Sequence, residues 1–309
     1  MASRVVLISG VGRYLGASVA AALAADSSID RIIGIDTAPS APTALDHTEY
    51  VRADIAHPLI GKILDQAEVT TVVHTNRAGD PAGLRSLLRA CERSRTVTRF
   101  VLASSPAVYG ASRRDPAVFA ERTPAVAEVS PGAARSAEEA ETSVRTFARG
   151  RPDIAVTVLR LAPLIGPSVD SRLTRYLTPR VVPVRIGFDP RLQLLHESDA
   201  VEVLGRAATA HHPGIFNVAG DGVLTLTALL RRAGRLRVPV PAAVLRLRGV
   251  DVGWLTHGRV VDTTTLKTRL GYQPRYSTAA ALSSYVESRT PRPRLAAAAL
   301  ATAESVVTR

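Results

Sequence analysis

The chain contains little cysteine, lysine and aromatic sequence, and each of these scarcities argues against a particular structural feature or class of partner. A single cysteine, Cys91, excludes an internal disulfide and suits a reducing compartment. Lysine occurs only at Lys62 and Lys267, so arginine supplies nearly all of the basic charge behind the formal net charge of +12. Aromatic residues make up 4% of the chain, and no helix-turn-helix, zinc or RNA-binding signature accompanies the arginines. We therefore expect no specific nucleic-acid partner.

Long apolar runs are also lacking. No stretch is long enough to span a bilayer, and the first strand starts at Arg4 with no signal peptide before it, so we expect a cytoplasmic protein. A length of 309 residues and a hydrophobic content of 46% suffice for one large α/β domain with a smaller lobe.

The most informative stretch is Arg4–Gly16, in which a short apolar strand runs into a glycine-rich turn and then an alanine-rich helix. Gly10, Gly12 and Gly16 stand where a backbone must bend sharply and approach a pyrophosphate closely. The start of the helix offers free N–H groups and a partial positive charge to that anion. The pattern predicts the phosphate-binding turn of a dinucleotide fold; a glycine turn without a ligand is the alternative.

A second apolar strand, Arg31–Ile35, ends in Asp36, twenty positions after Gly16. An acidic side chain at this place accepts hydrogen bonds from an adenosine ribose and repels a 2′-phosphate. The spacing therefore favours NAD over NADP as the cofactor.

Strand and helix patterns alternate through the first half of the chain. Further strands are expected at 49–53, 69–75, 98–104 and 154–160, and helices at 17–25, 58–67, 80–93 and 134–149. This alternation predicts an α/β fold with a Rossmann-like, doubly wound parallel sheet. We expect residues 1–162, with returning C-terminal segments, to form the nucleotide-binding domain. Residues 163–289 would form a small substrate lobe and cap, and 290–309 a tail.

Nine short motifs follow one another in a fixed order over about residues 4–276. They are SGVGRYLG (9–16), GID (34–36), RADI (52–55), VVHT (72–75), SSPAVYG (104–110), LRLAPLIGP (159–167), LLHESDAVEVL (194–204), FNVAGDG (216–222) and DTTTLKTRLGYQP (262–274). In this order they resemble the extended short-chain dehydrogenase/reductases, the NAD-dependent epimerase/dehydratase family.

The resemblance implies a set of cofactor-binding residues. Gly10, Gly12 and Gly16 would hold the pyrophosphate and Asp36 the ribose, with Asp54 and Ile55 flanking the adenine and His74 and Thr75 forming the floor. Arg13 replaces the family's middle glycine, so its guanidinium either crowds the diphosphate or neutralises it.

The family's chemistry uses a tyrosine, a lysine four residues later and a serine or threonine, because hydride transfer at an alcohol carbon requires proton transfer at its oxygen. Ser105 matches the family serine, with helix capping at a strand end as the alternative role. The tyrosine and lysine belong in residues 130–141, which contain neither in any register. If Gly132 replaces the tyrosine, Ser136 replaces the lysine.

Tyr109 is a candidate replacement acid, although the family usually uses this position structurally. The nearby acidic residues Glu138, Glu139 and Glu141 are expected on a solvated helix face.

His196 is expected at the junction with the lobe, and Asp199 as the cap of a helix beginning at Ala200. His211 and His212 fall in a loop without metal-ligating company, so no metal is assigned.

Arginines recur through the C-terminal third. Arg172, Arg175, Arg180, Arg185 and Arg191 could grip a diphosphate, or could simply be solvated. Residues 231–248 are basic and apolar together; they are expected to form a lobe helix packed on the core, with an interfacial helix as the alternative.

Three functional hypotheses follow. The first is an NAD-dependent enzyme that acts on a nucleotide-sugar-like or other hydroxyl or keto substrate with a degenerate catalytic set. The second is a catalytically inactive NAD-binding regulator or scaffold, and the third a basic binder of nucleic acid or membrane surfaces. The resemblance also suggests a homodimer through the helices after Asp80 and Ser130, although Leu87 and Leu88 fit a core equally well.

Overall fold

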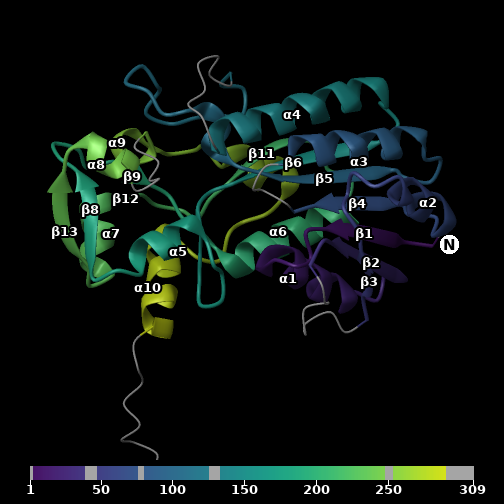
Figure 1. Ribbon diagram of the computed structural model, residues 1–309, viewed down its shortest axis with the longest axis horizontal. Helices are drawn as coiled ribbons and strands as arrows, with labels where there is room; N and C mark the ends of the chain where they lie inside the picture. Colours follow the sequence, from purple (N-terminus) through teal and green to yellow (C-terminus); the bar gives the residue numbers. More distant parts are fainter. Residues whose placement is uncertain (1–2, 39–46, 76–79, 125–132, 248–252, 290–309) are drawn as a thin grey trace, which may run out of the picture.

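The computed structural model describes residues 3–38, 47–75, 80–124, 133–247 and 253–289. Figure 1 shows a large part, in which a sheet is layered between helices, and a smaller lobe at the opposite end of the molecule. Two predicted features, Gly132 and the tail at 290–309, lie outside the described residues.

The elements follow the predicted alternation and then become shorter in the lobe. The strands are β1 Val5–Ser9, β2 Arg31–Asp36, β3 Glu49–Arg52, β4 Thr71–His74, β5 Arg99–Ser104, β6 Ala155–Leu161, β7 Leu164–Ile165, β8 Val181–Arg185, β9 Arg191–Leu192, β10 Leu195–His196, β11 Gly214–Val218, β12 Leu224–Thr225, β13 Leu236–Val240 and β14 Gly258–Arg259. The helices are α1 Tyr14–Ala24, α2 Leu59–Gln66, α3 Pro81–Arg93, η1 Pro106–Tyr109, α4 Ala133–Gly150, α5 Arg172–Leu177, α6 Glu197–Thr209, α7 Leu226–Arg232, α8 Ala242–Leu247, α9 Trp254–His257, η2 Leu266–Leu270 and α10 Thr278–Arg289.

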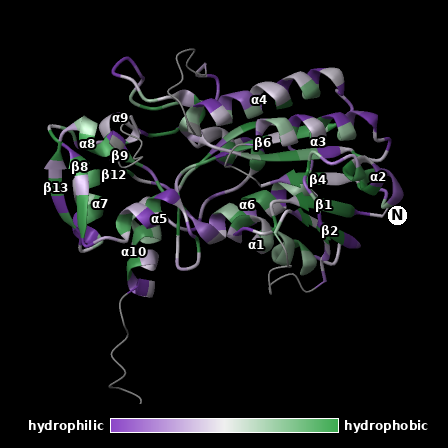
Figure 2. Ribbon diagram, in the orientation of Figure 1, coloured by the Kyte–Doolittle hydropathy of each residue, from purple (hydrophilic) through white to green (hydrophobic). Residues whose placement is uncertain are grey.

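The large part is built on a parallel sheet with the strand order β11-β6-β5-β4-β1-β2-β3. Its central strands are fully buried and mostly apolar, as expected when helices cover both faces, and Figure 2 shows them as largely hydrophobic. The strand order reverses between β1 and β4, which is where open α/β sheets form their ligand crevice. The predicted fold class is confirmed.

Two hydrophobic cores lie on opposite faces of this sheet. One packs α1 and α6 against it through residues such as Val19 and Val203. The other packs α2, α3 and α4 through residues such as Leu64, Leu87 and Phe147. Leu87 is completely buried and Leu88 is 4% exposed, so both leucines belong to the core rather than to an open face of α3.

The lobe has a third core of its own, which α5, α7 and α10 form together with residues of the three small sheets. Between the lobe segments the chain returns to the large part, where α6 covers one face and β11 becomes the edge strand beside β6. Among the described helices, none is long and apolar enough to cross a membrane.

The helix predicted over residues 231–248 is wrong. The segment contains the last turn of α7, the strand β13 and the short helix α8. Gly234 has a φ of +65°, which ends α7, and prolines at 239 and 241 prevent a helix from continuing. β13 pairs in parallel with β8 as a two-stranded ribbon at the end of the lobe.

Candidate functional site

The glycine turn lies at the carboxyl end of β1, in the crevice where the strand order reverses. Gly10 has a φ of +88°, and its N–H donates to the carbonyl of Ile35. A Cβ added to Gly16 would lie 2.3 Å from the carbonyl oxygen of Gly10, so only glycine lets α1 approach β1 this closely. Arg13 is the N-cap of α1 and has no side-chain cap, so the helix start presents its N–H groups outward.

Asp36 stands directly over this turn. Its carboxylate accepts hydrogen bonds from the N–H of Gly12 at 2.9 Å and of Ala38 at 3.1 Å. A Cβ added to Gly12 would lie 2.7 Å from Cγ of Asp36, so any larger residue would have to displace this carboxylate. The structure therefore brings the acidic residue predicted at the end of β2 onto the predicted glycine turn.

The remaining predicted cofactor residues follow β3 and β4. Asp54 is exposed, and its carboxylate accepts from the N–H of Ala56 at 2.8 Å. Ile55 is half-buried beside the start of α3, where a Cβ on Gly83 would meet it at 2.7 Å. Thr75 is buried and donates from its Oγ1 to the carbonyl oxygen of Ser9 at 2.8 Å.

His74 is a buried neutral imidazole at the end of β4. Its Nδ1 lies 2.7 Å from Oγ of Ser9. Burial lowers the pKa of His74 to about 4, and the charge of Asp80 opposes this shift only in part. The side chain is therefore uncharged at neutral pH.

A small cleft of about 390 Å³, part of it open to solvent, lies beside His74 between β5 and the starts of α3 and α4. Its walls are His74, Asp80, Pro81, Leu84, Leu102, Ala103, Ser104, Ser105, Ser136, Ala137 and Ala140. No tyrosine or lysine stands among these described wall residues. Among the described residues, α4 lines the cleft with the small side chains of Ser136, Ala137 and Ala140.

Ser105 takes the capping role that the sequence left open, and its side chain also lies at the cleft. It is the N-cap of η1, where its Oγ accepts from the N–H of Ala107 at 3.2 Å, and it also lines the cleft. Accepting this bond leaves the hydroxyl proton available for another acceptor.

Tyr109 is completely buried, with its ring stacked on Phe119 at a centroid distance of 4.7 Å. Its hydroxyl lies 2.9 Å from Oδ1 of Asn217 and 3.0 Å from the carbonyl oxygen of Ala120, and it accepts from Arg160 at 2.6 Å. Burial raises the pKa of Tyr109, with Arg160 and Asn217 opposing the shift. These partners occupy the hydroxyl within the fold.

The prediction that Glu141 lies on a solvated helix face is wrong. Glu141 and Arg160 are 0% and 2% exposed and form a bidentate ion pair, with the shorter contact at 2.7 Å. The hydroxyl of Ser104, in the cleft wall, also donates to Glu141 at 2.7 Å. Buried charges need such partners, and Glu141 faces the sheet because α4 turns this side toward β5 and β6.

The cap predicted for Asp199 is also wrong. α6 begins at Glu197, and His196 is its N-cap. Asp199 is buried in the first turn, where it accepts from the backbone N–H groups of Arg275 at 2.8 Å and Tyr276 at 3.1 Å, and from the hydroxyl of Tyr272 at 2.9 Å. Asp199 therefore ties α6 to the segment that precedes α10.

A second cleft, of about 540 Å³ including open solvent, is lined by basic side chains from both parts of the molecule. Arg113, Arg191, Arg259 and His257 line it together with one acidic residue, Asp115. Of the five arginines considered together from sequence, only Arg191 lies here. Arg113 and Arg259 are 146 positions apart, and no local motif marks either one.

The other four arginines of that group lie elsewhere. Arg175 pairs with Asp170 at 3.3 Å, and Arg185 donates to Oγ1 of Thr256 at 2.5 Å. Arg172 and Arg180 are exposed. No metal-ligating group of three or more histidine, cysteine or acidic side chains occurs among the described residues.

A glycine turn after β1, with an acidic residue from the end of β2 over it, is the arrangement expected in a dinucleotide-binding fold. The chain belongs to the NAD dependent epimerase/dehydratase family, whose sequence profile matches residues 6–219. Uncharacterized proteins of Mycobacterium tuberculosis and Mycobacterium bovis are 41% identical over 316 aligned positions, which cover 93% of this chain and 84% of each relative.

Solved structures share the fold. MoeE5 in complex with UDP-glucuronic acid and NAD has a TM-score of 0.74 at 19% identity, covering 92% of this chain and 98% of its own. UDP-glucose 4-epimerase of Thermotoga maritima has a TM-score of 0.73 at 18% identity, with the same coverages. dTDP-glucose 4,6-dehydratase of Bacillus anthracis in complex with NAD has 0.72 at 16% identity, covering 92% and 96%.

Proposed function

We propose that the protein binds NAD and acts by hydride transfer on a nucleotide-sugar-like or other hydroxyl or keto substrate, with a reduced catalytic set. The observation that carries the proposal is the contact between Gly12 and Asp36, at 2.9 Å, above the start of α1. This contact supports a cradle for an adenosine ribose next to a diphosphate.

The residues of the crevice fit the cofactor. Gly10, Gly12 and Gly16 would hold the diphosphate against the start of α1, with the exposed Arg13 beside it. Asp36 would accept from the ribose. Asp54 and Ile55 would flank the adenine, and His74 and Thr75 would form the floor.

When bound, NAD supplies the acceptor and donor of a hydride. The side chain of this protein that would touch the substrate oxygen is Ser105, which keeps a free hydroxyl proton and lies in the cleft wall. Tyr109 would remain a structural residue, because Asn217, Ala120 and Arg160 occupy its hydroxyl. The proton of the reaction would then pass through Ser105 to water or to a group of the substrate itself.

The arginine-lined cleft supports a substrate that contains a diphosphate. Arg113, Arg191 and Arg259 offer planar guanidinium groups that suit phosphate oxygens. The solved structures that share the fold include complexes with UDP-glucuronic acid and UDP-glucose.

We place the protein in the cytoplasm, in keeping with its single buried cysteine.

Calorimetry with NAD and NADP tests the cofactor proposal. The protein should bind NAD more tightly than NADP, and Asp36→Ala should weaken NAD about ten- to a hundredfold, because hydrogen bonds to a charged group contribute about 1.5–3 kcal/mol. The same variant should relax discrimination against NADP. Asp65→Ala, which removes an exposed carboxylate on α2, is the matched control and should bind NAD as the wild type does. Equal affinities for wild type and Asp36→Ala would contradict the proposal.

A catalytically inactive NAD-binding regulator or scaffold is the second candidate, favoured by the small side chains that face the cleft from α4. Turnover assays with NAD and a panel of UDP- and dTDP-sugars separate the two. Hydride transfer that disappears in Ser105→Ala while NAD affinity is retained would support the enzyme. Tight NAD binding without turnover of any sugar in the panel would favour the inactive form.

A further inference from the structure

Arginine is concentrated in two segments that meet at the end of the lobe. Residues 171–188 and 222–250 contain ten arginines and no lysine, aspartate or glutamate, a net charge of +10 where the whole chain has +12. The rest of the chain carries 29 basic and 27 acidic residues, which nearly cancel. The first segment contains α5 and β8 and the second α7, β13 and α8, and the pairing of β8 with β13 joins them.

Large apolar side chains are exposed on the same ribbon. The register pairs Leu236 with Val181 and Val238 with Pro183, so these four side chains share one face. Leu236 is 59% exposed, Val181 50% and Val238 43%. Ile186, directly after β8, is 61% exposed, the highest value for a large apolar residue in the described part of the chain. Leu236, Val181 and Val238 thus form an exposed apolar patch, and such patches mark interaction sites.

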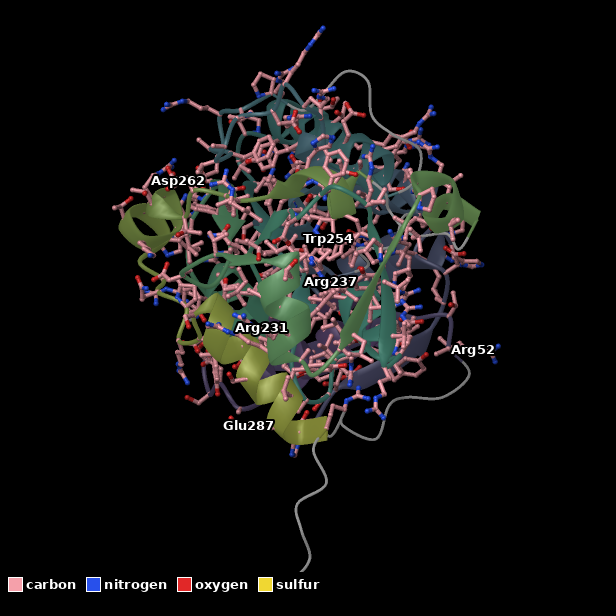
Figure 3. The ribbon with its side chains drawn as sticks, turned by 90° about the vertical axis from the view of Figure 1, so that its left-hand side faces the viewer. Arg52, Arg231, Arg237, Trp254, Asp262 and Glu287 are labelled. Carbon is pink, nitrogen blue, oxygen red and sulfur yellow. The ribbon has the colours of Figure 1, made fainter. Side chains whose placement is uncertain are left out.

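Exposed arginines lie close to this ribbon. Arg180 directly precedes β8, and Arg231 and Arg232 end α7. Arg237 lies within β13 but on the opposite face, where it donates to Oγ1 of Thr227 at 2.8 Å. Figure 3 looks onto this end of the molecule, with Arg231 and Arg237 labelled. The nearest acidic group along β8 is Asp189, whose carboxylate already accepts from the N–H of Thr227 at 2.8 Å.

We propose that this basic–apolar ribbon, formed by β8, β13 and the arginines beside them, docks on the anionic surface of a lipid bilayer. Leu236, Val238 and Val181 would enter the boundary between headgroups and acyl chains, while the arginines bind headgroup phosphates. The two requirements of an interfacial protein, an apolar contact and attraction to anionic lipid, are thus met on one surface. This inference does not depend on the reaction at the NAD crevice.

Charge and chemistry favour lipid over the other occupants. A second copy of the chain would bring two arginine-rich surfaces together, and Pro239 interrupts the free edge of β13 for strand pairing. A nucleic acid would match the charge but would leave the aliphatic side chains without a partner, because single-stranded nucleic acids stack on aromatic rings.

Co-sedimentation of the full chain with vesicles tests the proposal. The protein should bind vesicles of equal parts phosphatidylglycerol and phosphatidylcholine, and not vesicles of phosphatidylcholine alone, and binding should fall as salt rises. Leu236→Ser should weaken binding about tenfold, because the leucine leaves water when the ribbon docks. Leu59→Ser is the matched control: this leucine is 39% exposed on α2, at the opposite end of the molecule (Figure 1), and its variant should bind as the wild type does.

A second pair of variants tests the charge. Arg231→Gln with Arg232→Gln should weaken vesicle binding about tenfold or more, and Arg85→Gln with Arg89→Gln, two exposed arginines on α3, should leave it unchanged. Unchanged thermal unfolding shows that each variant is folded. Three outcomes overturn the proposal: no binding to anionic vesicles, equal loss in both arginine pairs, or a wild-type dimer that Leu236→Ser dissociates. Salt-sensitive binding to DNA or to an acidic polypeptide in place of vesicles would also overturn it.

Discussion

Gly16 is the position at which one added methyl group would disturb the cofactor crevice most. Its Cβ would lie 2.3 Å from the carbonyl oxygen of Gly10 and 2.8 Å from Oγ1 of Thr75, and both atoms belong to the turn and floor of the crevice. We expect Gly16→Ala to lower the free energy of unfolding by about 2 kcal/mol, because α1 must move away from β1. Urea unfolding followed by circular dichroism measures the change.

Gly61→Ala is the control for this prediction. Gly61 lies within α2, and a Cβ there meets no atom within 4 Å, so alanine should stabilise the helix by about 0.5–1 kcal/mol. If both variants shift the urea midpoint in the same direction, the contact between a Cβ at position 16 and the carbonyl oxygen of Gly10 does not explain the change in stability.

At the scale of single residues, the sequence predicted best where a residue acts through the backbone beside it. Gly10, Gly16 and Asp36 were predicted because a strand, a turn and a helix follow one another within a few positions, and the structure brings the three residues together at one turn. Arg113 and Arg259 were missed because they meet only after the large part and the lobe have come together. The residues next to Arg113 and Arg259 in the sequence do not distinguish these two arginines from the many others in the chain.

Helix α4 and strand β6 are held together by the ion pair between Glu141 and Arg160. We expect Glu141→Ala to lower the free energy of unfolding by about 3–5 kcal/mol, because the guanidinium would be left buried without its partner. Glu139→Ala, two residues earlier, breaks an exposed pair with Arg135 and should cost less than about 1 kcal/mol. Chemical unfolding of the two variants measures the contrast, and similar losses would show that the buried pair does not fix α4.

At the scale of elements, hydrophobic periodicity predicted where helices and strands lie in the large part, but not which polar residues turn inward. Glu139 and Glu141 look alike in sequence, and their environments differ because Arg160 lies opposite only one of them. In the lobe, residues 231–248 mix arginine and aliphatic residues in a way that suits either a helix or a strand. In the structure, residues 236–240 form the strand β13, which hydrogen bonds to β8 stabilise.

Whole-molecule stability should depend on pH through His74. Its folded-state pKa of about 4 lies below the ordinary value of 6.5, so the unfolded chain binds a proton more readily between these values. Stability from the neutral imidazole is therefore complete above about pH 6.5 and is lost as the pH falls toward 4. We expect about 2 kcal/mol to be lost between pH 7 and pH 4.5.

Urea unfolding at several pH values measures this loss, and His74→Gln provides the comparison. The glutamine keeps a polar partner for the hydroxyl of Ser9 but cannot titrate, so the variant should lose less stability over the same range. Parallel profiles for the two proteins would show that other groups control the acid sensitivity.

The order of the central strands along the chain has a consequence for folding during translation. β11, the edge strand beside β6, comes from residues 214–218, after the chain has already passed through β8, α5 and α6. While the protein is being translated, β6 thus keeps an unpaired hydrogen-bonding edge until roughly two-thirds of the polypeptide has left the ribosome. A ribosome that stalls shortly after β6 would release a fragment prone to associate through that edge, so the exposure of β6 is confined to a defined interval of translation.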